Sequence, residues 1–214
     1  MFTGIVREVG EVEAARRSAG VTVLEINAPA TVSGLAIGDS VAVNGVCLTV
    51  TALRGHRFQV DLSPETLRTT TAGGWRSGDR VHLEPSLRAS DSLGGHFVLG
   101  HVDDVGRVDR VKRLGGSRQV TVTAAPRVLA QLLPKGSISV DGVSLTLDSG
   151  PFGRSFTVTL IPQTLRETRF ASLKPGDVVN LEVDVLAKAA RSAANAAPRA
   201  GLTLQDILAR GWRR

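Results

Sequence analysis

The sequence predicts an all-β fold: two tandem, homologous, six-stranded antiparallel β-barrels of the Greek-key type, followed by a C-terminal α-helix. Three observations predict this fold. A hairpin segment is written twice, each half carries short stretches of alternating apolar residues, and an alanine-rich segment follows the second half. Short strands with regular turn signals and little helix are typical of small barrels, which close and so leave no exposed sheet edge.

The repeated hairpin defines the duplication. Residues 40–50 read Ser-Val-Ala-Val-Asn-Gly-Val-Cys-Leu-Thr-Val, and residues 137–147 read Ser-Ile-Ser-Val-Asp-Gly-Val-Ser-Leu-Thr-Leu, an offset of 97. Two apolar alternations with a glycine at the turn indicate a β-hairpin. The repeat divides the 214 residues into domains at 1–96 and 97–185, each long enough to bury its own core.

The remaining elements follow in the same order in both halves. Each half opens with an extended segment (2–12 and 98–108), then an alternating strand (21–26 and 120–123), then a short helical turn opened by Pro29 or Pro126. After the hairpin comes a strand (58–62 and 156–160) that runs into a Pro-x-Thr-Leu turn (64–67 and 162–165). A Gly-Asp turn (78–79 and 176–177) precedes the last strand, which ends in Leu-Glu.

The C-terminal segment, residues 186–214, lacks the strand pattern. Residues 185–197 are rich in alanine with helical spacing, and Pro198 ends the predicted helix. A second short helix is predicted at 203–208, with Thr203 as its N-cap. Because helices this short are unstable alone, the segment must pack on the barrels or on another subunit.

Composition favours a globular protein of the cytoplasm. The chain is 42% hydrophobic and 21% charged, and no apolar run approaches the roughly 20 residues of a membrane span. The opening residues lack the pattern of a signal peptide. A single cysteine excludes an internal disulfide and fits a reducing compartment.

The net charge of +6 does not predict nucleic-acid binding. Of 26 basic and 20 acidic residues, six basic and one acidic follow residue 185, which leaves 20 and 19 in the two barrels. The basicity therefore belongs to the tail and not to a groove across the body, and only 4% of residues are aromatic. A solvated basic tail is the preferred interpretation.

Cys47 is the first candidate for chemistry. On the alternating strand it shares a face with Thr49, whereas Leu48 and Val50 share the opposite face. If Leu48 and Val50 fill the core, Cys47 faces outward beside polar groups. A small buried hydrophobe and a functional thiol both remain open interpretations.

Two histidines lie in the glycine-rich join between the repeats. His96 and His101 are either solvated loop residues or proton-transfer groups. The second interpretation is stronger for His101, which takes the place that Ile5 has in the first copy. No metal site is predicted, because His56 and His82 lie in a turn and a strand without a carboxylate cluster. The absence of a Gly-rich phosphate loop disfavours a doubly wound nucleotide fold, and these residues alone identify no reaction.

Four motifs together resemble the riboflavin synthase family, alpha-chain type: residues 1–6, 44–50, 94–103 and 141–146. The resemblance covers about residues 1–185 in the right order. It implies conversion of two molecules of 6,7-dimethyl-8-ribityllumazine into riboflavin and 5-amino-6-ribitylaminouracil by transfer of a four-carbon unit, without metal or redox cofactor. It also implies a homotrimer, held partly by the C-terminal helix, with each productive site between the N-terminal barrel of one subunit and the C-terminal barrel of its neighbour.

The resemblance further implies one lumazine site in each barrel. For the N-terminal barrel the implied residues are Gly4, Ile5, Val6, Cys47, Leu48, Thr49, Asp61, Leu62, Ser63, Pro64, Glu65 and Thr66. For the C-terminal barrel they are Gly100, His101, Val102, Ser144, Leu145, Thr146, Thr159, Leu160, Ile161, Pro162, Gln163 and Thr164, with Lys135 reaching a neighbour's ligand. Gln163 departs from the glutamate common in the family, which removes a charge but keeps the hydrogen-bonding reach.

The reaction needs loss of a proton from one 7-methyl group and a nucleophile at C7 of the other lumazine. The expectation is proton transfer by His101 or His96, and an activated N-terminal site formed by Ser40, Cys47 and Thr49. Cys47, a hydroxyl and water all remain open as the nucleophile. The difference between Cys47 and Ser144 is expected to separate the acceptor lumazine from the donor.

Two alternatives accompany the enzyme hypothesis. One is a non-catalytic lumazine- or flavin-binding protein of the antenna type, which has the same barrels but loses part of the reacting set. The retained Ser40, Cys47, His96 and His101 favour the enzyme. The other gives the basic tail a role in packing with a partner assembly, for which lumazine synthase is the candidate.

Overall fold

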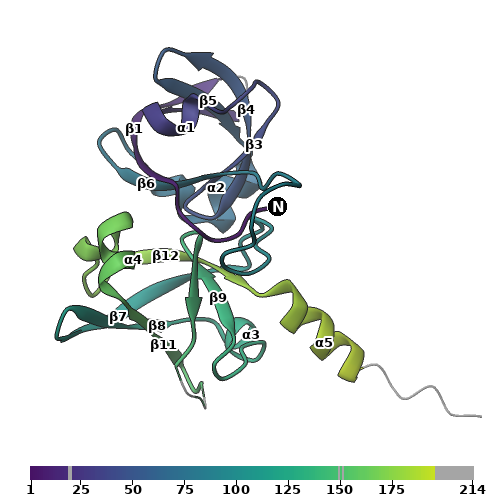
Figure 1. Ribbon diagram of the computed structural model, residues 1–214, viewed down its shortest axis with the longest axis vertical. Coiled ribbons are helices and arrows are strands. Elements are labelled where there is room, and N and C mark those ends of the chain that lie inside the picture. Colours follow the sequence, from purple (N-terminus) through teal and green to yellow (C-terminus); the bar gives the residue numbers. More distant parts are fainter. Residues whose placement is uncertain (19–20, 149, 151, 196–214) are drawn as a thin grey trace, which may run out of the picture.

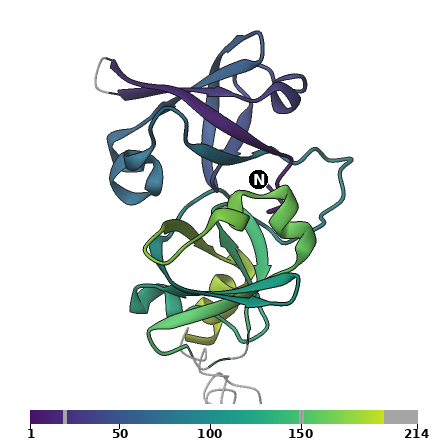
Figure 2. The same ribbon diagram turned by 90° about the vertical axis from the view of Figure 1, so that its left-hand side faces the viewer.

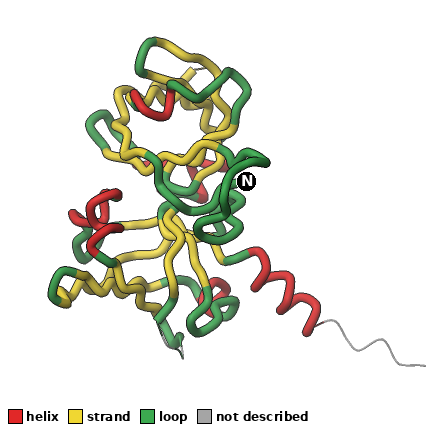
Figure 3. Tube along the Cα trace, viewed as in Figure 1, coloured by secondary structure: helices red, strands yellow, loops and turns green. Residues whose placement is uncertain are grey.

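The fold is a tandem pair of β domains, as predicted. The computed structural model describes residues 1–18, 21–148, 150 and 152–195. The domains lie one above the other, and the N-terminus lies at the junction between them (Figures 1 and 2). Strands and loops make up most of both domains, with helices confined to short pieces and the C-terminal end (Figure 3).

The first domain is a closed barrel with the strand order β1-β2-β5-β4-β3-β6, in which all neighbours are antiparallel. This order is of the Greek-key type, because β5 returns to lie beside β2 while β6 closes on β1. The strands are β1 (Glu8–Ser18), β2 (Val21–Asn27), β3 (Ser40–Val43), β4 (Val46–Arg54), β5 (Arg57–Leu62) and β6 (Arg80–Pro85).

The second domain repeats this topology as a six-stranded sheet in the order β10-β9-β12-β7-β8-β11. Its end strands, β10 and β11, are joined by an isolated bridge between Leu147 and Val158. The strands are β7 (Asp104–Leu114), β8 (Ser117–Thr123), β9 (Ser137–Val140), β10 (Val143–Thr146), β11 (Ser155–Leu160) and β12 (Val178–Val183).

Proline starts every short α-helix of the two domains, since its fixed φ suits a first helical position and its missing N–H is not needed there. These helices are α1 (Pro29–Val32), α2 (Pro64–Thr69), α3 (Pro126–Leu129) and α4 (Pro162–Glu167). The segments expected as Pro-x-Thr-Leu turns are therefore helical. Each runs into a 3₁₀ turn, η1 (Thr71–Gly74) or η2 (Arg169–Ser172), capped by the hydroxyl of Thr70 or Thr168.

Each domain has its own apolar core, built from the inward face of the alternating strands. Phe58 and its counterpart Phe156 are both buried in these cores. The alternation is legible in β5, where Phe58, Val60 and Leu62 are buried while Asp61 is exposed. Burial of these side chains is the main stabilising term for either domain.

The opening strands are longer than the sequence predicted. β1 and β7 continue to Ser18 and Leu114, beyond the expected ends at residues 12 and 108. A register shift follows Val12 in β1 and Val108 in β7, and each strand then pairs with its neighbour as a ribbon rich in charged residues. In the β7 ribbon Val111 packs against the second core, but charged residues lie on both sides of it, so the sequence shows no apolar alternation.

The C-terminal helix α5 (Val185–Asn195) is present and projects away from the barrels (Figure 1). Lys188 ties its first turns to the second domain through an ion pair with Asp103 at 2.7 Å. The predicted break at Pro198 and the second helix at 203–208 lie outside the described residues. Among the helices that the structure describes, none has the length and apolar character needed to cross a membrane.

Candidate functional site

The two repeated hairpins meet at their turns. Asn44 and Gly45 have φ of 44° and 77°, and Asp141 and Gly142 have φ of 44° and 79°, the left-handed pair that a two-residue hairpin turn requires. A Cβ on Gly45 would lie 2.6 Å from the Gly142 nitrogen, and a Cβ on Gly142 would lie 2.7 Å from the Gly45 nitrogen. Glycine is therefore needed for the approach of the two backbones as well as for the turn.

Reciprocal side chains hold the junction together. His82 of the first domain lies between two backbone groups of the second. Its Nε2 accepts from Arg169 N–H at 3.0 Å. The proton is therefore on Nδ1, which donates to the Asp141 carbonyl at 2.9 Å. Burial lowers the pKa of His82 to about 3, which keeps the ring neutral. Its counterpart Asn180 donates to the Asn44 carbonyl at 2.8 Å and accepts from the N–H of η1.

The opening segment of each repeat crosses to the other barrel's hairpin. Phe2 and Val98 pair with each other at the centre, with N–H···O distances of 2.7 and 3.1 Å. Beyond this pair, the Gly4 carbonyl accepts from Ser144 N–H at 2.8 Å, and the Gly100 carbonyl accepts from Cys47 N–H at 2.9 Å. The structure thus places Gly4 with the Ser144 hairpin and Gly100 with the Cys47 hairpin, the reverse of the grouping expected from chain order.

The residues that follow Gly4 and Gly100 also contact the opposite domain. Val6 packs against the core of the second domain, and Val102 packs against the core of the first. Ile5 and His101 are exposed at equivalent positions. His101 therefore stands on the side of the Cys47 hairpin, and Ile5 on the side of the Ser144 hairpin.

Two buried glutamates, which are not among the site residues predicted from the sequence, fix these crossing segments. Glu84 accepts from the N–H of Thr3 at 2.7 Å, from the Thr3 hydroxyl at 2.7 Å and from Gly4 N–H at 2.9 Å. Glu182 accepts from Leu99 N–H at 2.7 Å and from Gly100 N–H at 2.9 Å. The recurring Leu-Glu at the end of each last strand was the available signal.

Burial dominates the ionisation of both glutamates. Desolvation raises the pKa of Glu182 to about 7, although the N–H groups of Leu99 and Gly100 and the charge of Lys188 oppose the rise. It also raises the pKa of Glu84, against the hydrogen bonds from Thr3 and Gly4 and the charge of Arg7. A carboxyl group whose pKa is raised to about 7 is thus hydrogen-bonded to Gly100, a predicted site residue.

The face of β4 opposite the core carries the candidate groups predicted for it. Leu48 and Val50 are buried in the first core, while Cys47 is half-buried beside Phe2 and Val98 and Thr49 is exposed. Ser40 pairs with Thr49 across β3 and β4, so both side chains share the outer face with Cys47. The structure therefore brings Ser40, Cys47 and Thr49 together.

His96 lies on the other side of the junction from His101. Its Nδ1 is 2.7 Å from the Ser144 hydroxyl, its backbone N–H donates to the Thr3 carbonyl, and only 8% of the residue is exposed. Burial lowers the pKa of His96, against the charge of Asp184, so the ring is neutral at pH 7. A neutral imidazole in contact with a hydroxyl can exchange a proton with it.

The remaining predicted substrate residues line two open polar edges. On the first, Asp61, Ser63 and Glu65 are exposed, and the Ser63 hydroxyl caps α2 by accepting from Thr66 N–H at 3.1 Å. Leu62 is buried beneath them, and Pro64 starts the helix.

The second edge is similar. Thr146, Thr159, Ile161, Pro162 and Gln163 are exposed, and Leu145 and Leu160 are buried. Thr164 is half-buried in α4, and Gln163 hydrogen-bonds Glu167 at 3.0 Å. Lys135 is exposed in a turn with φ of 62°. Most residues of both edges are thus exposed in the part of the chain that the structure describes.

Comparison with known proteins places this geometry in a family. The model of the lumazine binding domain matches residues 3–86 and again residues 99–184. Riboflavin synthase of Bacillus amyloliquefaciens is 40% identical over 188 residues, which span 88% of this chain and 87% of that protein. The chain belongs to the riboflavin synthase family. The resemblance inferred from the four motifs is thereby confirmed, together with the enzyme class, since riboflavin synthases are transferases.

Other riboflavin synthases give the same result. The proteins of Actinobacillus pleuropneumoniae and Bacillus subtilis are each 38% identical over 88% of this chain and 87% of their own lengths. Among solved structures, LumP complexed with riboflavin has a TM-score of 0.79 at 23% identity, and LumP complexed with 6,7-dimethyl-8-(1'-D-ribityl) lumazine a TM-score of 0.77 at 22%. Each comparison covers 86% of this chain and 99% of LumP and shows the shared fold.

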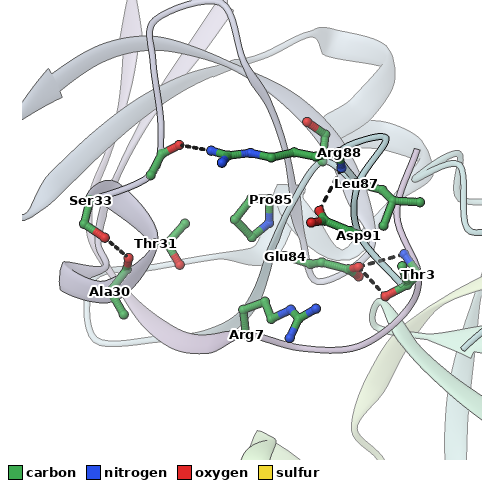
Figure 4. Close-up of a pocket in the computed structure, with 12 residues that line it drawn as sticks. Thr3, Arg7, Ala30, Thr31, Ser33, Glu84, Pro85, Leu87, Arg88 and Asp91 are labelled. Atoms are coloured by element: carbon green, nitrogen blue, oxygen red, sulfur yellow. Dashed lines mark hydrogen bonds between the residues drawn. The ribbon is translucent and has the colours of Figure 1, made fainter. Parts of the chain in front are cut away.

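Two pockets of this riboflavin synthase family member lie away from the polar edges, whereas a third, of about 590 Å³, borders the first edge at Pro64. A cavity of about 330 Å³ lies between α1 and the segment after β6, lined among others by Arg7, Thr31 and Arg88 (Figure 4). It reaches the crossing segment only through Thr3 and Glu84. A second cavity, of about 420 Å³, lies at the junction beside Arg169. Neither contains Cys47, Ser144 or the exposed edge residues.

The raised pKa of Glu182 predicts a pH-dependent stability that Glu182→Gln removes. A carboxyl whose folded-state pKa is raised from 4.5 to about 7 favours folding fully below pH 4.5 and loses that contribution as pH rises through 7. The free energy of unfolding of the wild type should therefore fall relative to Glu182→Gln between pH 5 and pH 8, by on the order of 2 kcal/mol. Urea unfolding across this range measures it, and parallel curves for the two proteins would contradict it.

Proposed function

We propose that the chain catalyses the dismutation of two 6,7-dimethyl-8-ribityllumazine molecules into riboflavin and 5-amino-6-ribitylaminouracil. The observation that carries the proposal is identity of about 40% to riboflavin synthases over 88% of the chain. The duplicated geometry supports it: a reaction between two identical molecules suits two equivalent polar edges. Backbone groups on such edges can recognise the heterocycle, and Thr, Ser and Asp side chains the ribityl hydroxyls.

The two edges differ in their reactive groups, which suits two different roles for the same substrate. The first offers Cys47, Thr49 and Ser40, with His101 on the crossing segment. The second offers Ser144 in contact with His96. We assign loss of the 7-methyl proton to a histidine and addition at C7 to a nucleophile on the Cys47 side. Alignment of the two lumazines contributes further, by removing the entropic cost of their encounter.

A single-substrate assay tests this function. Purified protein is mixed with 6,7-dimethyl-8-ribityllumazine alone, without added metal or redox cofactor, and riboflavin absorbance is followed. The proposal expects riboflavin and the ribitylaminouracil in equal amounts. Tight binding of the lumazine without product would instead support the non-catalytic binding protein.

His101→Ala is expected to lower turnover by about 10²-fold or more, the usual contribution of a proton-transfer group, while lumazine affinity changes far less. His56→Ala is the matched control, because His56 is an exposed histidine in the β4–β5 turn. Steady-state rates and fluorescence titration of bound lumazine separate the two effects. Unchanged turnover in His101→Ala would remove this residue from proton transfer.

We further propose that the chain acts in the cytoplasm as a homotrimer in which a neighbour covers each open edge. Its support is that most residues of the two edges are exposed and that α5 projects from the barrels with Leu186 58% exposed. Lys135 is then placed to reach the ligand of the neighbouring subunit. Contact of the basic tail with lumazine synthase stays a prediction, since residues 196–214 lie outside the described part.

Leu186→Glu is expected to convert the trimer to monomer, because a carboxylate in a helix interface loses its hydration without gaining a partner. Leu114→Glu is the control: Leu114 ends β7 and is 41% exposed, remote from α5. Light scattering measures the molar mass of both variants. A trimer that survives Leu186→Glu would show that α5 does not hold it.

A further inference from the structure

Glu84 and Glu182 occupy the same place in the two domains, on the last strand of each. Each carboxylate accepts backbone N–H groups of a crossing segment, Thr3-Gly4 for Glu84 and Leu99-Gly100 for Glu182. Both side chains are almost fully buried. Without them the N–H groups they pair would be buried donors without acceptors, a costly arrangement.

The hydrogen bonds of Glu182 reach the site on the opposite barrel. Glu182 belongs to the second domain, yet the carbonyl of the Gly100 it holds accepts from Cys47 N–H in the first domain. A Cβ on Gly100 would lie 2.5 Å from the Cys47 Cβ, so the segment is in close contact with this residue. Glu84 acts in reverse: it belongs to the first domain, and the Gly4 that it holds meets Ser144 in the second.

We propose that Glu182 and Glu84 are positioning residues that each act on the site of the other barrel. Glu182 fixes the backbone of Leu99-Gly100, the wall beside Cys47, and Glu84 fixes the backbone of Thr3-Gly4, the wall beside Ser144. The assignment of these walls to lumazine sites rests on the proposed function. The crossing itself rests on the hydrogen bonds alone. The site at the Cys47 hairpin of the first barrel therefore depends on Glu182 of the second barrel. The site at the Ser144 hairpin of the second barrel depends on Glu84 of the first.

Cys47 makes the proposal testable at one site, because it is the only cysteine of the chain. In the full-length protein without ligand, Glu182→Gln is expected to raise the rate of Cys47 alkylation by iodoacetamide about tenfold. Leu99 N–H and Gly100 N–H use different carboxylate oxygens, and glutamine replaces one of these by an NH2 donor, so one N–H group loses its acceptor. Loss of one hydrogen bond to a charged group accounts for a change of this size. Glu84→Gln, the matched control, should raise the rate several-fold less, because the segment that Glu84 holds reaches Cys47 only through the packed Phe2 side chain and makes its backbone contact with Ser144.

Protection by riboflavin gives the second measurement. Glu182→Gln should raise the riboflavin concentration that half-protects Cys47 by about tenfold, and Glu84→Gln should not. Equal effects of the two variants, or a larger effect of Glu84→Gln, would overturn the crossing. If riboflavin fails to protect Cys47 in the wild type, the placement of the ligand is contradicted, while the ligand-free alkylation rates still decide the crossing. Should Glu182→Gln fail to fold, Glu182→Asp keeps the charge with a shorter reach and serves the same comparison.

Discussion

Gly45→Ala is expected to destabilise the protein by about 3 kcal/mol or more, whereas Gly55→Ala should cost only about 1 kcal/mol. Both glycines have positive φ, 77° at Gly45 and 59° at Gly55, so alanine is strained in either turn. They differ in what surrounds them. A Cβ on Gly45 would lie 2.6 Å from the nitrogen and 3.0 Å from the Cα of Gly142, whereas nothing lies within 4 Å of a Cβ on Gly55. Backbone cannot move aside as a side chain can, so Gly45→Ala must separate the hairpins.

Chemical denaturation of the two variants measures this difference directly. Because the contact joins the two domains, Gly45→Ala should also broaden or split the unfolding transition as the barrels lose their coupling. Gly55→Ala should unfold in the same transition as the wild type, at slightly lower denaturant. Equal losses in the two variants would mean that the hairpin turns do not pack against each other in solution.

Arg169→Thr is expected to cost about 3 kcal/mol, because it leaves the Asp141 carboxylate buried without its cation. Asp141 is fully buried at the hairpin turn and pairs with Arg169, which is itself largely covered. At the equivalent positions the first repeat has two uncharged residues, Asn44 in place of Asp141 and Thr71 in place of Arg169. The double variant Asp141→Asn, Arg169→Thr copies that chemistry and should recover most of the loss.

The pH dependence distinguishes this explanation from a simple packing defect. Burial raises the pKa of Asp141, and the charge of Arg169 opposes that rise. Without Arg169 the neutral acid is favoured further, so the deficit of Arg169→Thr should shrink as pH falls and grow as pH rises. The double variant lacks this carboxyl, so its deficit should not grow with pH and should shrink, because the raised pKa of Asp141 makes the wild type lose stability as pH rises. Urea unfolding at pH 4, 6 and 8 tests this, and a pH-independent deficit in the single variant would contradict it.

The sequence predicted the elements whose pattern is local. Strands that cover a core reveal themselves by alternation, as β5 does with Phe58, Val60 and Leu62. The outer face of β4 followed from the same rule, and the structure places Ser40, Cys47 and Thr49 on it together. The Pro-x-Thr-Leu pattern predicts only a turn, because a six-residue helix is too short to show a helical period in the sequence.

Contacts between the domains could not be predicted in this way. The sequence of residues 2–6 does not indicate whether they contact the first or the second hairpin. The contact is made by backbone hydrogen bonds, which any residue type except proline can form. His82 and Asn180 differ in type although they perform equivalent bonds, so the repeat concealed their shared role. Glu84 and Glu182 were visible as a repeated pair, but a glutamate at a strand end is ordinarily solvated, and only the structure shows it buried.

The exchange of residues 2–4 and 98–100 between the barrels is the arrangement found when two identical subunits swap a terminal arm. One repeat alone would carry its glutamate and its hairpin, but its own arm would find its place only on a second copy. The present chain is equivalent to such a swapped dimer with its two halves joined covalently. The join holds each half at a high effective concentration for the other, so both arms dock however dilute the protein is.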